Sequence, residues 1–165
     1  MDRLLNFLNA NWRGFIAGAL LVGGPLAGIL VTTTLNREDT ATRLRLEDYQ
    51  AISATQEEFN RLLERFTATL STSGVPDATL VADLSSNIST LYSKVAAFSP
   101  NLGPEGAKAL DDYKASLAEV KTSLLTVREL GDMDPLAVDL VQMYESQRDV
   151  TPILAKAAGK TASGS

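Results

Sequence analysis

The residue types that most often carry out chemistry in proteins are few in this chain of 165 residues. It has no histidine and no cysteine, which removes thiolate nucleophiles, histidine bases and the usual zinc and haem ligands. Two acidic pairs, Asp111 with Asp112 and Asp132 with Asp134, lack the D-x-D-x-D-G spacing of a calcium loop. We therefore expect no metal site, no cofactor and no enzymatic activity.

The balance of charge argues against nucleic acid as a partner. The chain carries 20 acidic and 15 basic residues, for a formal charge of -5, whereas affinity for nucleic acid comes mainly from basic groups that neutralise phosphates. Where opposite charges occur at helical spacing, as in Glu57 and Arg61, we expect a solvated ion pair on a helix surface, worth a few tenths of a kcal/mol.

Residues 14–35 form a long apolar segment that contains no ionisable residue. As a helix the segment would be about 33 Å long, close to the thickness of about 30 Å of a bilayer's hydrocarbon core. Trp12 stands at one end, where interfacial aromatic residues are common, and Arg13 and Arg37 flank the run. A cleaved signal peptide is the alternative, but its apolar part is shorter and it ends in an A-x-A-like site, which is missing here. The pattern predicts a retained transmembrane anchor.

Residues 1–13 form a short tail before this anchor. Its apolar residues Leu4, Leu5, Leu8 and Trp12 fall at helical spacing, so the tail either lies on the membrane surface as an amphipathic helix or continues the anchor helix. Arginines are almost equally frequent on the two sides of the anchor. Because a short tail precedes the anchor and the rest of the chain follows it, we expect a cytoplasmic N-terminus and an exported C-terminal part.

Glycines in the anchor are spaced for helix association. Gly14 and Gly18 are four residues apart, as are Gly24 and Gly28, and each pair gives a small-residue face against which a second helix can pack closely. The alternative is that glycine is simply more frequent in membrane helices than in soluble ones. We predict that the four glycines mediate helix association within the membrane.

After the anchor, the pattern changes to amphipathic helices separated by glycine and proline. Ile52, Phe59 and Phe66 are seven residues apart in the first helix. Gly74 is expected at its left-handed end, Asp77 as the next cap, Pro104 in a first turn, and Pro152 as a kink or break. The expected helices span about 37–71, 78–98, 104–130 with Gly131 as terminator, and 134 onward behind an Asp134 cap.

Four such helices joined by short loops predict an all-α domain, an antiparallel up-down four-helix bundle over residues 36–158. Residues 159–165 have the composition of a disordered tail. The first helix is longer than the others, so we expect its N-terminal part to be covered by another element or to stand as a stalk.

The segment ALDDYKASLAEVKTSLLTVRELGDMDPLAVDLVQMYESQRDVTPILAKAA resembles the second half of the four-helix-bundle periplasmic sensor domain of bacterial chemoreceptors and histidine kinases. A long helix ends in a Gly-Asp turn, here Gly131-Asp132, and the next helix has a proline, here Pro152, near its membrane-proximal end. The resemblance implies a bacterial inner-membrane protein with a periplasmic domain. Such receptors also carry a second membrane helix and a signalling module, so this chain is expected to be either a free-standing relative or a fragment.

In that family, arginines hold the carboxylates of small acidic ligands, because a guanidinium pairs with a carboxylate through two hydrogen bonds. The resemblance therefore makes four arginines on the expected helices candidates for ligand binding: Arg61, Arg65, Arg128 and Arg148. Two functions follow. The protein is expected to be a sensor-like or ligand- or protein-binding domain that acts by helix association as a homodimer in the lipid bilayer. Alternatively, it is an accessory subunit whose glycine-rich anchor docks onto a larger membrane protein complex.

Overall fold

The computed structural model describes residues 40–98 and 102–159, and in these residues the protein is all-α. Four α-helices and a short 3-10 helix occur in this part of the chain, and no strand does, which confirms the all-α part of the predicted fold. The elements are α2 (Thr40–Ser73), α3 (Ala78–Ala97), α4 (Pro104–Thr126), η1 (Leu130–Asp132) and α5 (Met133–Ala157).

The predicted anchor (14–35), the tail before it and residues 160–165 lie outside the described residues. The four glycines proposed for helix association lie there too. None of the described helices combines the length and the apolar character that crossing a membrane requires.

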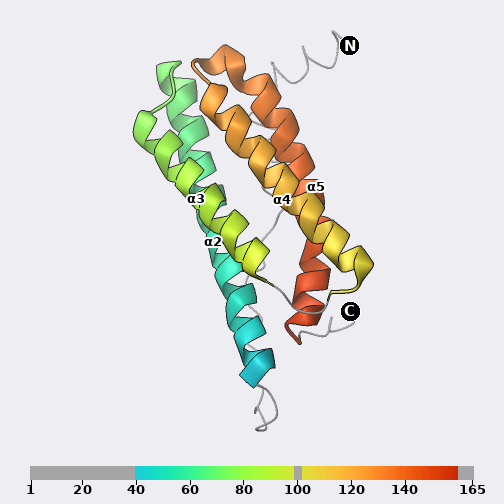
Figure 1. The fold of residues 1–165 in the computed structure, drawn as a ribbon. Helices are drawn as coiled ribbons and strands as arrows, with labels where there is room; N and C mark the ends of the chain where they lie inside the picture. The colour runs from blue at the N-terminus through green and yellow to red at the C-terminus, as the bar shows by residue number, and fades with distance from the viewer. Residues whose placement is uncertain (1–39, 99–101, 160–165) are drawn as a thin grey trace, which may run out of the picture.

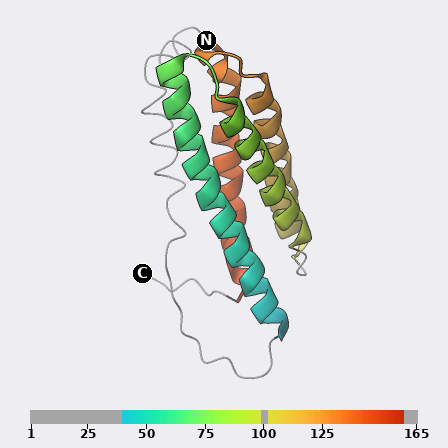
Figure 2. The ribbon, with the colours of Figure 1, turned by 90° about the vertical axis from the view of Figure 1, so that its left-hand side faces the viewer.

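The four α-helices lie side by side and enclose one apolar core (Figures 1 and 2). The amide of Leu130 donates to the carbonyl of Gly74 at 3.0 Å, so the α2–α3 connection and the segment after α4 meet at one end. At the other end Gly106 of α4 lies next to Ile153 of α5, because a Cβ on Gly106 would be 3.2 Å from Ile153 Cγ2. The N-terminal turns of α2 reach beyond the ends of the other helices in Figure 1.

The turn between α2 and α3 follows the sequence prediction closely. Gly74 has a φ of 76°, a left-handed conformation that glycine adopts without steric cost, and its amide donates to Leu70 O at 2.8 Å. Asp77 caps α3, since its Oδ1 accepts from the amides of Thr79 at 2.8 Å and Leu80 at 3.1 Å. Helices α2 and α3 therefore form a hairpin whose turn is set by local interactions.

The junction of α4 and α5 differs from the prediction in two respects. Helix α4 ends at Thr126 and not near Leu130, because Asp132 Oδ2 accepts hydrogen bonds from the amides of Arg128 at 2.8 Å and Glu129 at 3.2 Å. These bonds fold the chain into a turn that leads into η1. The residue that precedes α5 is Asp132, so the predicted cap at Asp134 is wrong and Asp134 lies in the first turn.

Pro152 does not break α5. Of the two predicted outcomes, a kink or a break, the break is wrong, since the helix continues from Met133 to Ala157 with Pro152 inside it. Proline removes one helical hydrogen bond there. Val150 and Leu154, on either side, are buried in the core, 0 % and 2 % exposed. We attribute the continuity of the helix to this burial, which holds both flanking turns against the neighbouring helices.

The core comes from the apolar stripes that the sequence pattern indicates. Ile52, Phe59 and Phe66 of α2 are all buried, as expected from their spacing of seven residues. On α3 the stripe consists of Leu80, Leu84, Ile88, Leu91 and Val95. Because these positions face inward, the opposite faces of α2 and α3 are left to polar side chains.

Candidate functional site

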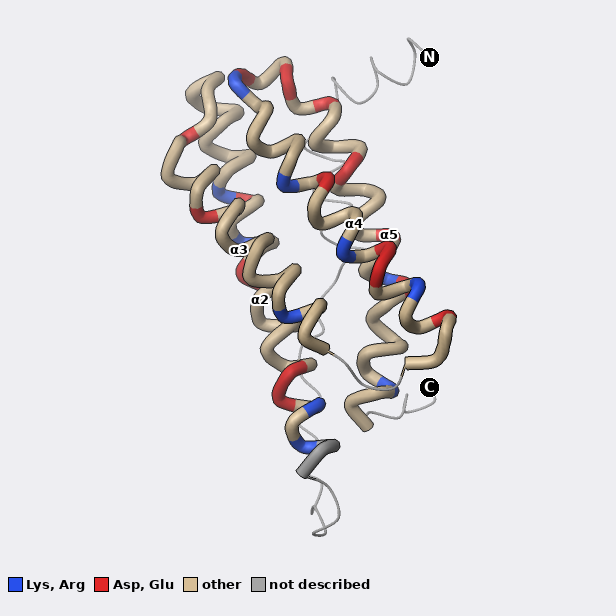
Figure 3. The backbone as a smooth tube through the Cα atoms, viewed as in Figure 1, with Lys and Arg blue, Asp and Glu red and all other residues tan. Residues whose placement is uncertain are grey.

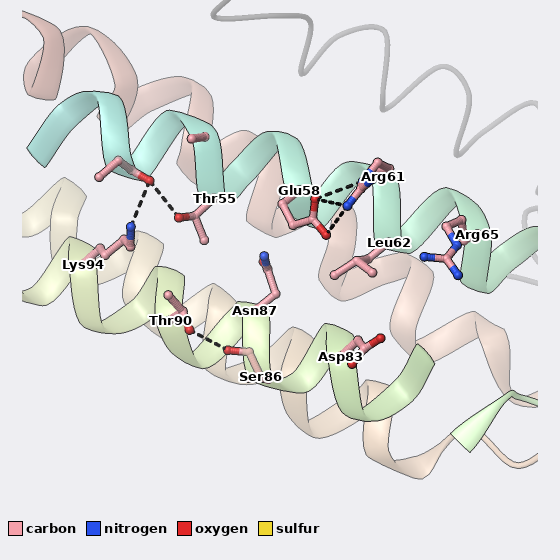
Figure 4. Close-up of a pocket in the computed structure, with 12 residues that line it drawn as sticks. Thr55, Glu58, Arg61, Leu62, Arg65, Asp83, Ser86, Asn87, Thr90 and Lys94 are labelled. Atoms are coloured by element: carbon pink, nitrogen blue, oxygen red, sulfur yellow. Dashed lines mark hydrogen bonds and ion pairs between the residues drawn. The ribbon is translucent and has the colours of Figure 1, made fainter. Parts of the chain in front are cut away.

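An open groove of about 660 Å³ runs along the outer side of the α2–α3 hairpin (Figure 4). From α2 it is lined by Ala51, Ala54, Thr55, Glu58, Arg61, Leu62 and Arg65, and from α3 by Asp83, Ser86, Asn87, Thr90 and Lys94. Almost all of these residues are polar or small. The groove therefore brings together two of the four predicted ligand-binding arginines, Arg61 and Arg65.

Small side chains leave the middle of the groove hollow. Ala51 and Ala54 line it from α2, and Ser86 and Thr90 line it from α3. The hydroxyls of Thr90 and Thr55 donate back to their own helices, to Ser86 O at 3.0 Å and Ala51 O at 2.7 Å. The hydroxyl hydrogen of each threonine is therefore already in a hydrogen bond, while its oxygen can still accept one.

Arg61 is already engaged by a neighbour on its own helix. Its Nε and Nη2 donate to the two carboxylate oxygens of Glu58 at 2.9 and 2.8 Å. The partner is Glu58 and not Glu57, so the predicted i, i+4 pair is wrong and an i, i+3 pair takes its place. The hydrogen bond from Arg61 lowers the pKa of Glu58, and the charges of Arg61 and Arg65 add to this. The carboxylate of Glu58 is therefore kept ionised and largely neutralised.

Arg65 and Asp83 have no such partner. Neither forms an ion pair or a side-chain hydrogen bond with another described residue, and they stand on opposite walls near the α2–α3 turn (Figure 4). At the far end of the groove, Lys94 Nζ donates only to the backbone oxygen of Ala51, at 3.4 Å. Two cations that form no ion pair with a described carboxylate, Arg65 and Lys94, thus mark the two ends of the groove.

Asn87 lies between these ends and points across the groove. Its amide nitrogen is directed toward α2 in Figure 4. Its Oδ1 is buried and has no hydrogen-bond partner among the described residues, an arrangement that is uncommon for a buried polar atom. Asn87 thus presents N–H donors in the middle of a groove whose threonines present acceptors.

The other two predicted arginines are not part of this site. Arg128 is exposed in the segment after α4. Arg148 is exposed on α5, where its Nε lies 3.6 Å from Asp149 Oδ1. Conversely, sequence reasoning missed Lys94 and Asn87. Their sequence signal was weak, since each is a single polar residue on the solvent side of an amphipathic helix.

The opposite side of α2 is joined to α4 and α5 by buried side-chain hydrogen bonds. Gln56 Nε2 donates to the hydroxyl of Tyr113 at 3.0 Å, and the hydroxyl of Tyr144 donates to Asn60 Oδ1 at 2.8 Å. Burial raises the pKa of Tyr113, offset in part by the Gln56 bond, and burial and the nearby Tyr113 raise the pKa of Tyr144. Both phenols are therefore neutral at physiological pH, and they position α2 without taking part in the groove.

The charged residues of the described helices form no large patch of a single sign (Figure 3). Acidic and basic residues are interspersed along the helices, with acidic ones frequent at the end where α4 meets α5 (Figure 3). In residues 40–98 and 102–159 no three acidic side chains come together in a way that would hold a metal ion.

Neither a protein-family model, nor a curated protein, nor a solved structure matches this chain. The groove thus has to be interpreted from its own chemistry.

Proposed function

We propose that the protein is a non-enzymatic, single-pass membrane protein whose exported helical domain binds an anionic ligand in the α2–α3 groove. In this proposal residues 14–35 anchor the chain in the inner membrane, and residues 36–158 form an antiparallel up-down four-helix bundle in the periplasm. The glycine-rich anchor associates with a second helix, so that the domain works as a sensor-like module in a homodimer.

A single observation carries the ligand-binding part of this proposal. Arg61 and Arg65, predicted as ligand-binding residues, share one groove, and Arg65 has no carboxylate partner among the described residues. A guanidinium that is not neutralised by the protein is a good receptor for a carboxylate, since it offers two parallel N–H donors. Asn87 and the threonine hydroxyls add uncharged hydrogen-bonding groups beside it.

The bundle topology is supported by the contacts at the two ends of the helices. The amide of Leu130, which follows α4, donates to the carbonyl of Gly74 in the α2–α3 turn, and Gly106 near the start of α4 lies next to Ile153 near the end of α5. An up-down arrangement of four helices joined by short loops satisfies both contacts.

The test of ligand binding uses the full chain purified in mild detergent. Citrate, a compact tricarboxylate, is titrated by calorimetry into the unaltered protein and into Arg65→Gln. Arg128→Gln is the matched control, because Arg128 is also exposed but lies outside the groove. We expect binding that weakens in Arg65→Gln and is unchanged in Arg128→Gln. Equal affinity in all three proteins would refute the groove as a site for carboxylates.

The assembly is tested separately, by native mass measurement of the protein extracted from membranes. A homodimer that is weakened by Gly24→Leu with Gly28→Leu supports the sensor-like function. A stoichiometric foreign subunit would instead establish the accessory function. A reporter enzyme fused after Ser165 tests the orientation, and cytoplasmic activity of that reporter would contradict the exported domain.

A further inference from the structure

The groove is too long and too open for a compact acid to use all of it. Arg65 and Ala51, which lie at its two ends on α2, are 14 positions apart and hence about 21 Å apart along the helix axis. Lys94 reaches the Ala51 end, where it donates to Ala51 O. A small carboxylate held at Arg65 therefore leaves Lys94 and the whole middle of the groove without a ligand.

Exposure makes a single contact at the Arg65 end weak. Arg65 is exposed, and an ion pair formed at an exposed position contributes at most about 1 kcal/mol. Affinity in such a groove has to come from several contacts along one ligand, because each additional contact is made without a second loss of translational freedom. A ligand that reaches both cations gains this advantage.

The middle of the groove favours groups that both donate and accept hydrogen bonds. Thr55 and Thr90 have used their hydroxyl hydrogens on their own helices and offer acceptor oxygens, while Asn87 directs its N–H donors into the groove. A peptide bond has a matching N–H donor and C=O acceptor. No unpaired charge lies in this stretch, since Glu58 and Arg61 neutralise each other.

We infer that the α2–α3 groove binds an extended acidic peptide segment, with one carboxylate at Arg65 and a second at Lys94. At about 3.3 to 3.6 Å per residue, a distance of about 21 Å corresponds to roughly six residue-to-residue steps. The segment therefore carries acidic side chains about six positions apart, with small uncharged residues between them. Asp83, on the wall opposite Arg65, disfavours further acidic residues at that end. This inference rests on the proposed function of the groove as an anion-binding site.

Three blocked heptapeptides test the spacing against the full chain in mild detergent. The spaced probe is acetyl-Glu-Gly-Ser-Ser-Ser-Gly-Glu-amide, the clustered probe has the same composition with the two glutamates adjacent near the middle, and the neutral probe has glutamines in place of the glutamates. Labelled peptides are titrated by fluorescence anisotropy. We expect the spaced probe to bind more tightly than the clustered one, and the neutral probe to bind weakest.

Two variants then test whether Arg65 and Lys94 each bind one carboxylate of the spaced probe. We expect Arg65→Gln and Lys94→Gln each to weaken binding of the spaced probe by about fivefold, which corresponds to the loss of one solvent-accessible ion pair. The matched controls Arg128→Gln and Lys156→Gln lie outside the groove and should leave its affinity unchanged. The circular dichroism spectrum of each variant shows whether it is folded.

The outcomes separate this inference from the proposed function on which it rests. Equal binding of the spaced and clustered probes, or no effect of Lys94→Gln, overturns the extended peptide. If citrate still binds and depends on Arg65, the proposed anion site survives that result. If neither citrate nor any acidic peptide binds, both the peptide inference and the proposed function are refuted.

Discussion

The buried contact between Gln56 and Tyr113 predicts an unusual pattern of mutational effects. Gln56 is 5 % exposed and Tyr113 is 0 % exposed, and Gln56 Nε2 donates to the Tyr113 hydroxyl at 3.0 Å. The other amide atom of Gln56, Oε1, is buried with no hydrogen-bond partner among the described residues. The interaction therefore consists of one satisfied hydrogen bond and one unsatisfied acceptor in the core.

Removing one partner should cost more than removing both. Tyr113→Phe leaves Nε2 of Gln56 buried without its acceptor, and such a loss costs about 1 to 3 kcal/mol. Gln56→Leu leaves the Tyr113 hydroxyl without its donor and should also destabilise. The double variant removes every polar atom of the contact, including the unpaired Oε1, so we expect a stability equal to or above that of the unaltered protein.

Thermal unfolding followed by far-ultraviolet circular dichroism measures these effects in the full chain. At roughly 4 °C per kcal/mol for a domain of this size, Tyr113→Phe should lower Tm by about 4 to 12 °C. Tyr92→Phe is the control, because Tyr92 is 42 % exposed and loses only a solvated hydroxyl. If the Tm of the double variant is lowered by the sum of the losses of the two single variants, the explanation by unsatisfied buried groups is refuted.

Three further predictions concern stability. Because burial raises the pKa values of Tyr113 and Tyr144, the folded state keeps protons that the unfolded chain releases above pH 10, so stability should fall as the pH rises beyond that value; tyrosinate absorbance equal to more than two of the chain's four tyrosines, reached before the helical signal is lost, would contradict this. Gly106→Ala should lower Tm despite its higher helix propensity, because the new Cβ would lie 3.2 Å from Ile153 Cγ2; a higher Tm would show that α4 and α5 separate easily. Asp77→Ala should destabilise α3 by about 1 kcal/mol and Asp77→Asn by much less, as measured by urea unfolding, and equal losses would argue against capping.

Helix positions were predictable from this sequence where a single residue of the expected type marks the end or the start of a helix. The end of α2 depends on Gly74 and the start of α3 on Asp77, and both residues act on amides or carbonyls a few positions away. The predicted end of α4 and the predicted cap of α5 were wrong, because three acidic residues that could each act as a cap, Glu129, Asp132 and Asp134, lie within six positions of one another. Sequence alone did not show that Asp132 would bind the amides of Arg128 and Glu129.

The groove was only partly predictable, for a different reason. It lies between the solvent sides of two helices, so its composition depends on how α2 and α3 are rotated against each other. Arg61 and Arg65 are one turn apart on the same helix and could be grouped from the sequence. Lys94 and Asn87 join them only through the packing of α3 on α2, and no periodicity within either helix reports that packing.

The two sides of α2 have separate roles, and this has a consequence for how the protein can be altered. At 3.6 residues per turn, Gln56 and Asn60 fall on nearly the opposite side of the helix from Glu58 and Leu62. The former hold α2 to Tyr113 and Tyr144, whereas the latter line the groove. Substitutions of exposed groove residues should therefore change binding with little effect on unfolding, and substitutions of the buried tyrosines should do the reverse. If the proposed function is right, a ligand bound on one side of α2 is linked to α4 and α5 through the hydrogen bonds on the other side of the same helix.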